Sequence, residues 1–214
     1  MAFSEEVERR IEDGWQAVQA MDPRAYNGPL LRVLSPVRET DESVSVAADI
    51  GYREVVGMRR HKDLLGWVPT TEQFQVLSAI AFVETADGRL LFRERNTGDW
   101  EHSLELSGGF IVAKDVPDTV GVYIRDRVAA DLLAPPDVIY SLERIGHIDF
   151  KSICESMFVY KIRLAVTLRD LTHTARTFVE VPKEYTLASH QSFFPLPLHP
   201  PSKKVLELFL PTLR

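Results

Sequence analysis

The stretch from Gly108 to Leu133 reads GGFIVAKDVPDTVGVYIRDRVAADLL. A double glycine closes a predicted strand, a short polar loop follows, and a helix is predicted to begin near Asp118, its expected N-cap. Glycine lets the backbone approach a ligand closely, and the free N–H groups and dipole at the start of a helix favour negative charge. The stretch therefore predicts a loop and a helix that suit a diphosphate ligand.

Strands are predicted on both sides of this segment. Residues 75–85 and 89–95 form two strands joined across the turn Ala86-Asp87-Gly88, and residues 104–112 form a third that leads into the loop. Pro135-Pro136 ends the helix. Beyond it we expect strands at 138–148, 154–166 and 178–182, then a terminal helix capped by Ser202. This order predicts an α+β fold, an α/β/α sandwich with a mixed sheet between helices.

Residues 1–72 are predicted to form an extension, and residues 73–214 the main domain. The extension begins with a helix from the cap Ser4 to about Met21, with one apolar stripe. Three apolar runs between turn signals follow it and are predicted to be strands of an antiparallel element, at 30–34, 43–50 and 52–58.

Composition limits the class of protein. The chain has 214 residues, and its net charge of −6 argues against a nucleic-acid binder but leaves room for a local basic pocket. The single cysteine, Cys154, excludes an intrachain disulfide and favours a reducing compartment. No run reaches the roughly 18 apolar residues of a membrane-spanning helix, and the first residues lack a secretion signal. We therefore expect a soluble, cytoplasmic protein without a membrane partner.

The opening stretch resembles the signature of the Nudix hydrolases, which is glycine, five residues, glutamate, seven residues, then Arg-Glu-aliphatic-x-Glu-Glu-x-Gly-aliphatic. Gly109 and Asp115 match its beginning, with five residues between them. Arg125 and Asp126 match the Arg-Glu pair, after nine residues instead of seven. The resemblance implies a Nudix-like fold with a degenerate signature.

The resemblance covers residues 73–214, about two-thirds of the chain. The segments YNGPLLRVLS and IGYREVVGMRR also resemble the extension of larger Nudix proteins related to nucleotide-sugar diphosphatases. In such proteins the extension helps to form the substrate cleft or a dimer interface. The resemblance thus implies one of these two roles here, the second of which would make the protein a homodimer.

The metal site of the family is largely missing. In Nudix enzymes three carboxylates hold divalent cations, and positions i, i+3 and i+4 place them on one helix face. Ala129 and Ala130 stand where the family has paired glutamates, so that Asp126 alone remains. Asp131 lies roughly 140° around the helix from Asp126 and is predicted to point elsewhere. Because Mg²⁺ takes several oxygen ligands, we expect it to bind weakly or not at all.

The first functional hypothesis is a Nudix-like binding or regulatory protein. It would hold a nucleoside-diphosphate-type ligand, a small phosphorylated molecule, at the loop–helix cleft, with the usual hydrolysis impaired or lost. Asp115 and Arg125 would pair and brace the loop against the helix, as the resemblance implies. The residues expected to bind the ligand are Gly108, Gly109, Trp100, Arg93 and Arg95.

The alternative is a divergent diphosphate hydrolase that acts on a nucleotide or a nucleotide sugar with Mg²⁺ or Mn²⁺. Asp126 and Glu105 would then be catalytic, and Asp126 and Glu155 would hold the metal with other strand carboxylates. A third hypothesis is a non-hydrolytic enzyme that reuses the cleft. The histidines, His199 among them, are scattered without metal-ligand spacing.

Overall fold

The computed structural model describes residues 1–35, 37, 44–60, 68–96, 101–115, 119–171 and 177–213. The chain divides into two compact units, each discontinuous in sequence. Unit 1 comprises Met1–Ala79, Gly109–Val120 and His147–Phe158, and unit 2 comprises Ile80–Gly108, Gly121–Gly146 and Val159–Arg214. The predicted division into domains at residue 72 stays a prediction.

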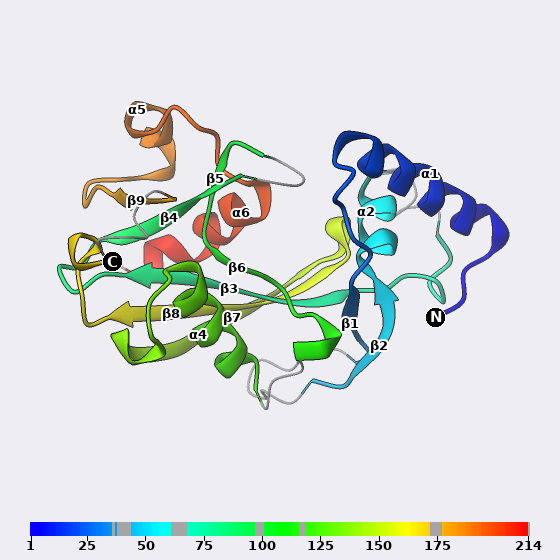
Figure 1. Cartoon of the computed structure of the whole chain (residues 1–214), viewed down its shortest axis with the longest axis horizontal. Coiled ribbons are helices and arrows are strands. Elements are labelled where there is room, and N and C mark those ends of the chain that lie inside the picture. Colours follow the sequence, from blue (N-terminus) through cyan, green and yellow to red (C-terminus); the bar gives the residue numbers. More distant parts are fainter. Residues whose placement is uncertain are drawn as a thin grey trace. The chain divides into compact units, whose positions relative to one another are not determined.

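Unit 1 contains a pair of helices and the N-terminal strands (Figure 1). Strand β1 pairs antiparallel with β2, and its Arg32 also pairs with Val76 at the start of β3. Two short 3-10 turns complete the unit. The elements are α1 (Glu5–Met21), β1 (Pro29–Val33), β2 (Val46–Gly51), α2 (Tyr52–Arg60), β3 (Val76–Glu84), η1 (Ala113–Asp115) and η3 (Lys151–Ile153).

Helix α1 has the predicted bounds and buries the predicted stripe, which includes Val7, Ile11 and Trp15. Ser4 stands at the N-cap position but makes no capping bond with its side chain. Its hydroxyl instead donates a hydrogen bond to the carboxylate of Glu72, at 3.0 Å. The helix is therefore stabilised by its buried face rather than by a side-chain cap.

The prediction of a strand at residues 52–58 is wrong, because this segment is helix α2. Part of the cap at its start comes from outside the helix: the Arg53 N–H donates to the side-chain oxygen of Asn27 at 2.9 Å. The Arg53 guanidinium also pairs with Glu8 and Glu12 of α1. Two adjacent valines raise the strand propensity of this segment, but these contacts are long-range and override it.

Close packing of α1 on α2 depends on two glycines. A Cβ placed on Gly57 would lie 2.6 Å from the carbonyl oxygen of Ile11, and one placed on Gly14 would lie 2.8 Å from the Cα of Gly57. Backbone therefore meets backbone at this crossing, and no larger residue fits without moving a helix.

Unit 2 contains the remaining sheet and the C-terminal helices (Figure 1). Strands β3, β6, β7 and β8, like α4, run from one unit into the other. The elements are β4 (Leu90–Arg95), β5 (Ser103–Glu105), β6 (Ser107–Phe110), α4 (Val120–Asp131), η2 (Pro136–Val138), β7 (Ile139–Phe150), β8 (Glu155–Leu164), η4 (Leu168–Asp170), β9 (Phe178–Val181), η5 (Leu187–Ser189), α5 (His190–Phe193), α6 (Pro200–Phe209) and η6 (Leu210–Thr212).

Strand β4 lies between β5 and β9, and it positions the site described below. Because successive side chains of a strand point to opposite faces, the side chains of Phe92 and Arg93 point to different sides of β4. Phe92 is fully buried and packs edge-on against Tyr185 and Phe194. This aromatic packing fixes the orientation of β4 and thereby that of Arg93.

The predicted strands between residues 75 and 182 are confirmed, and two details of this part of the chain are corrected. Residues 104–112 form two strands, β5 and β6, because the chain breaks its pairing at Leu106. Ser202 is not the cap of the terminal helix: α6 begins at Pro200 after the N-cap His199. The Ser202 hydroxyl instead accepts the Leu106 N–H, at 3.1 Å. Together the elements confirm the predicted α+β class.

Within the described ranges, no helix has both the length and the apolar character needed to cross a membrane.

We expect Gly57→Ala to lower the free energy of unfolding by about 2 kcal/mol, because the added methyl group collides with the backbone of α1. Urea unfolding followed by circular dichroism measures the change. Gln19→Ala, at an exposed position of α1, is the control and should leave stability nearly unchanged. Equal effects of both substitutions would contradict the close contact.

The thiol of Cys154 should react only when local or global unfolding exposes it to solvent. Burial raises its pKa to about 11, so at pH 8 the folded protein holds very little thiolate. We expect Ellman's reagent to modify Cys154 at pH 8 many times more slowly in buffer than in urea. Rapid modification of the native protein, at the rate of a free thiol, would show that Cys154 is accessible.

Candidate functional site

Two neighbouring strands of unit 2 bring arginines and a glutamate together. Arg93 of β4 stands directly opposite Glu105 of β5 in the antiparallel pair. Directly opposite residues share one face of a sheet, as do residues two positions apart along a strand. Arg95 therefore lies on the same face as Arg93, and both can reach Glu105.

The carboxylate of Glu105 is held by both arginines. Its Oε1 accepts from Arg93 Nε at 3.0 Å, and its Oε2 accepts from Arg95 Nη1 at 2.7 Å. The side chain is only 5% exposed. Burial by itself would raise the pKa of Glu105, but the positive charges of Arg93 and Arg95 outweigh it, and the pKa is lowered.

Helix α4 adds a second carboxylate at its last residue. Asp131 Oδ1 lies 2.7 Å from Arg93 Nη1 and 3.2 Å from Arg127 Nε. The side chain of Asp131 is 10% exposed, and its burial raises its pKa despite both arginines. Its other oxygen, Oδ2, is buried and lacks a hydrogen-bond partner in the described part of the chain. We call Arg93, Arg95, Glu105, Arg127 and Asp131 the arginine–carboxylate cluster.

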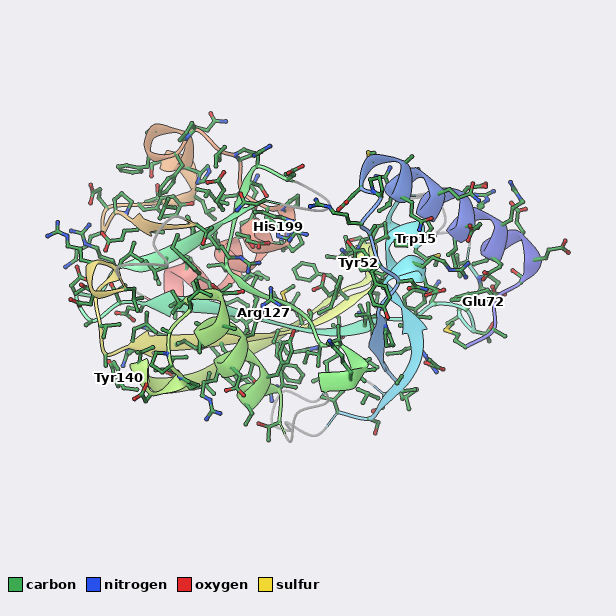
Figure 2. The ribbon with its side chains drawn as sticks, in the orientation of Figure 1. Trp15, Tyr52, Glu72, Arg127, Tyr140 and His199 are labelled. Atoms are coloured by element: carbon green, nitrogen blue, oxygen red, sulfur yellow. The ribbon has the colours of Figure 1, made fainter. Side chains whose placement is uncertain are left out.

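The C-terminal segment brings a histidine to this cluster. Leu198 forms a parallel bridge with Leu104 of β5, and the His199 N–H donates to the Leu104 carbonyl at 2.8 Å. The His199 Nδ1 then lies 3.9 Å from Oε2 of Glu105. Figure 2 labels His199, before α6, and Arg127, on α4. The spacing of histidines in the sequence gives no sign of this contact, because a strand pairing across about 90 residues creates it.

Asp126 lies on a different part of α4 from Asp131. Its carboxylate is 52% exposed and pairs with the neighbouring Arg125, at 2.9 Å. The expectation that Asp131 points away from Asp126 follows from the helical period. The helical period alone does not identify Asp131 as a site residue, although Asp131 and not Asp126 contacts Arg93.

Glu155 lies in unit 1 and is bound to an arginine of that unit. Its carboxylate is 2.9 Å from Arg59 Nη2, and the same guanidinium donates to the Ile153 carbonyl and lies over the ring of Phe110. The contacts hold Glu155 in a buried ion pair. Throughout the residues that the structure describes, no group of three or more histidine, cysteine, aspartate or glutamate residues has the geometry of a metal site.

Two of the remaining predicted residues form the double glycine. Gly108 and Gly109 are on β6 and have φ angles of 146° and 147°, a region that favours glycine. A Cβ on Gly109 would meet no atom within 4 Å, so the backbone here is open. Trp100 and the side chain of Asp115 fall outside the described residues, so the brace between Asp115 and Arg125 stays a prediction.

The charges of the cluster suit an anion better than a cation. Among the described residues of the cluster, three arginines face two carboxylates, which leaves one formal positive charge when His199 is neutral. Both oxygens of Glu105 and one of Asp131 already accept from guanidinium groups. Arg127 is 42% exposed, so it can offer donors to a ligand in solvent.

The sequence matches no family model and no curated protein. Among solved structures, the chain is similar to NrtR from Shewanella oneidensis, with 16% identity, a TM-score of 0.46 and coverage of 62% of this chain and 61% of that one. The chain thus spans about three-fifths of that structure. It is also similar to the NUDIX domain of the same NrtR complexed with ADP ribose, with 15% identity, a TM-score of 0.45 and coverage of 71% and 96%. A third similar structure is the Nudix hydrolase RenU from M. smegmatis, with 13% identity, a TM-score of 0.39 and coverage of 64% and 86%.

Replacing Glu105 by glutamine should destabilise the protein by about 3 kcal/mol at pH 7, because two half-buried arginines lose the buried carboxylate that pairs with them. The pKa of Glu105 is lower in the folded chain than its ordinary value of 4.5. Its stabilising contribution is therefore present above that pH and is lost as the pH falls below it. We expect unfolding of Glu105→Gln to depend less on pH below 4.5 than unfolding of the parent.

Urea unfolding at a series of pH values tests this expectation. Glu94→Gln is the control, since Glu94 neighbours Arg93 on β4 but points to the other face of the strand. Parallel pH profiles for the parent and Glu105→Gln would contradict the role assigned to Glu105.

Proposed function

We propose that this chain is a Nudix-like protein that binds a nucleoside-diphosphate-type ligand at the arginine–carboxylate cluster, with metal-dependent hydrolysis impaired or lost. The observation that carries the proposal is the convergence of three arginines from β4 and α4 on two buried carboxylates, which leaves net positive charge. The strand that carries Glu105 leads directly into the double glycine and the loop that resembles the Nudix signature.

Arginine is well suited to a diphosphate. Its planar guanidinium offers several donors in a fixed geometry, and it keeps its charge at every physiological pH. Arg93 is held from two sides by Glu105 and Asp131, so its orientation is fixed before a ligand arrives. Buried ion pairs add little net stability, whereas buried charges with shifted pKa values gather at functional sites. A binding role explains the cluster better than stability does.

Hydrolysis of the Nudix type needs bound divalent cations, and the described residues supply few ligands for them. Ala129 and Ala130 stand where the Nudix signature has its paired glutamates, and neither side chain has an atom that can bind a metal ion. Ala129 is also buried. A cation at Glu105 would have to displace Arg93 and Arg95. Mg²⁺ also keeps near-ideal octahedral geometry with several oxygen ligands, which one exposed Asp126 does not supply.

Isothermal titration calorimetry with ADP and with ADP-ribose tests the proposal, each in EDTA and in Mg²⁺. Binding in EDTA supports metal-free recognition. Binding that appears only with Mg²⁺ or Mn²⁺, followed by release of a phosphorylated product, would favour the alternative of a divergent hydrolase that uses Asp126 with strand carboxylates. An absence of binding under every condition would overturn the proposal.

Arg127→Ala should weaken binding of ADP in EDTA by about tenfold, because one charge-assisted hydrogen bond to phosphate is lost. Arg125→Ala is a closely matched control. Both arginines lie on α4, and both side chains are 42% exposed, but Arg125 pairs with Asp126 outside the cluster. Equal weakening by both substitutions would mean that the effect comes from general charge and not from the cluster.

A further inference from the structure

Among the described residues, one oxygen of the cluster has no hydrogen-bond partner. Asp131 Oδ1 takes both arginine contacts of this carboxylate, while Oδ2 is buried and makes no hydrogen bond within the described chain. A buried carboxylate oxygen without a partner is costly, and most such groups in proteins find a donor. The atom is therefore in place to accept a hydrogen bond.

The surrounding donors do not serve this oxygen. The guanidinium of Arg93 is shared between Glu105 and Oδ1 of Asp131, and that of Arg127 is directed at Oδ1. Arg95 binds the far side of Glu105. A donor for Oδ2 must then come from a group other than these side chains. That group must also lie close to the guanidinium groups of the cluster.

We infer that Asp131 Oδ2 accepts a hydrogen bond from a hydroxyl group of the ligand whose phosphate the arginines hold. The inference rests on the proposed function and deepens it: it assigns to Asp131 the recognition of a hydroxyl near the phosphate, such as a ribose hydroxyl of a nucleotide. The two groups of such a ligand match the cluster, since its phosphate needs arginine donors and its neighbouring hydroxyl needs an acceptor.

Access to Oδ2 depends on Arg127. This arginine is the more exposed of the two that contact Asp131, at 42% against 18% for Arg93, and its contact is the longer one. A phosphate that draws the Arg127 guanidinium outward uncovers the carboxylate without disturbing Arg93. Arg93 continues to hold Oδ1 of Asp131, so Oδ2 stays oriented.

Two matched probes separate the hydroxyl from the phosphate. Ribose 5-phosphate and cyclopentylmethyl phosphate share a five-membered ring and a phosphate, but only the first carries hydroxyl groups. A site built to bind a hydroxyl discriminates against an analogue that lacks it. We expect the parent protein to prefer ribose 5-phosphate by about tenfold in calorimetry or NMR titration at neutral pH, in EDTA.

Asp131→Asn tests the atom itself. The amide keeps the shape of the side chain, and its carbonyl oxygen will face the arginines, which places an N–H₂ donor where Oδ2 was. The loss of one negative charge beside the arginines favours both phosphates equally. The N–H₂ can still donate to the hydroxyl oxygen, but this neutral hydrogen bond is about half as strong as one to a carboxylate. We therefore expect the preference for ribose 5-phosphate to fall from about tenfold to about threefold, while cyclopentylmethyl phosphate binds as well as before or more tightly. Arg127→Ala, in contrast, should weaken both probes and keep their ratio.

Each outcome decides the inference. A preference that stays at about tenfold in Asp131→Asn, or a parent that binds both probes equally, would overturn the inference and leave the proposed function intact. A parent that binds neither probe and does not bind ADP would overturn the proposed function as well. If Asp131→Asn does not fold, Asp131→Glu keeps the charge and moves the acceptor by one methylene group, and the same loss of preference is expected.

Discussion

The guanidinium of Arg93 joins three elements of unit 2. It connects its own strand, β4, to Glu105 on β5 and to Asp131 at the end of α4. A buried arginine must be paired, and a buried carboxylate must be paired in turn, so none of the three charges is stable without the others. The position of α4 against β4 and β5 therefore depends on an electrostatic contact as well as on apolar packing. The fixed network presents Arg95 and Arg127 at its more exposed edge.

The two carboxylates respond to the same arginine in opposite ways. The pKa of Glu105 is lowered because Arg93 and Arg95 both bind it, whereas that of Asp131 is raised because burial outweighs its arginines. The two carboxylates also differ in their hydrogen bonds: among the described residues both oxygens of Glu105 have donors, and only one oxygen of Asp131 does. Glu105 thus anchors Arg93, and Asp131 retains an acceptor that the described part of the chain does not use.

Much of the fold is predictable from the sequence because it depends on local patterns. Strands β3 and β4 follow from apolar runs around a turn at Gly88, whose positive φ suits glycine. Helix α1 follows from its apolar stripe. Helix α2 is not predictable in this way, since one of its capping oxygens comes from Asn27 and two partners of Arg53 come from α1. Such contacts exist only once the chain has folded.

The candidate site likewise contains residues that local patterns predict and residues that only long-range contacts bring to it. Arg93, Arg95 and Glu105 lie on two neighbouring strands near the double glycine, so alternation along the strands is enough to propose them. Asp131 and His199 are missed for different reasons. Alignment with the Nudix signature directs attention to the face of α4 that carries Asp126, although the buried end of this helix carries Asp131. His199 reaches Glu105 only through the bridge between Leu104 and Leu198.

Arginines and divalent cations are alternative ways to neutralise a phosphate. A site that binds cations needs free carboxylates, and carboxylates without a metal repel the phosphate that they are meant to serve. Under the proposed function, loss of the paired glutamates at Ala129 and Ala130 removes that repulsion, and the arginines supply the positive charge directly. The carboxylates that remain are then bound to arginine and serve to orient it. An arginine offers directional donors but activates no water molecule, so under the proposed function the two alanines leave recognition of a phosphate intact and remove the means of cleaving it.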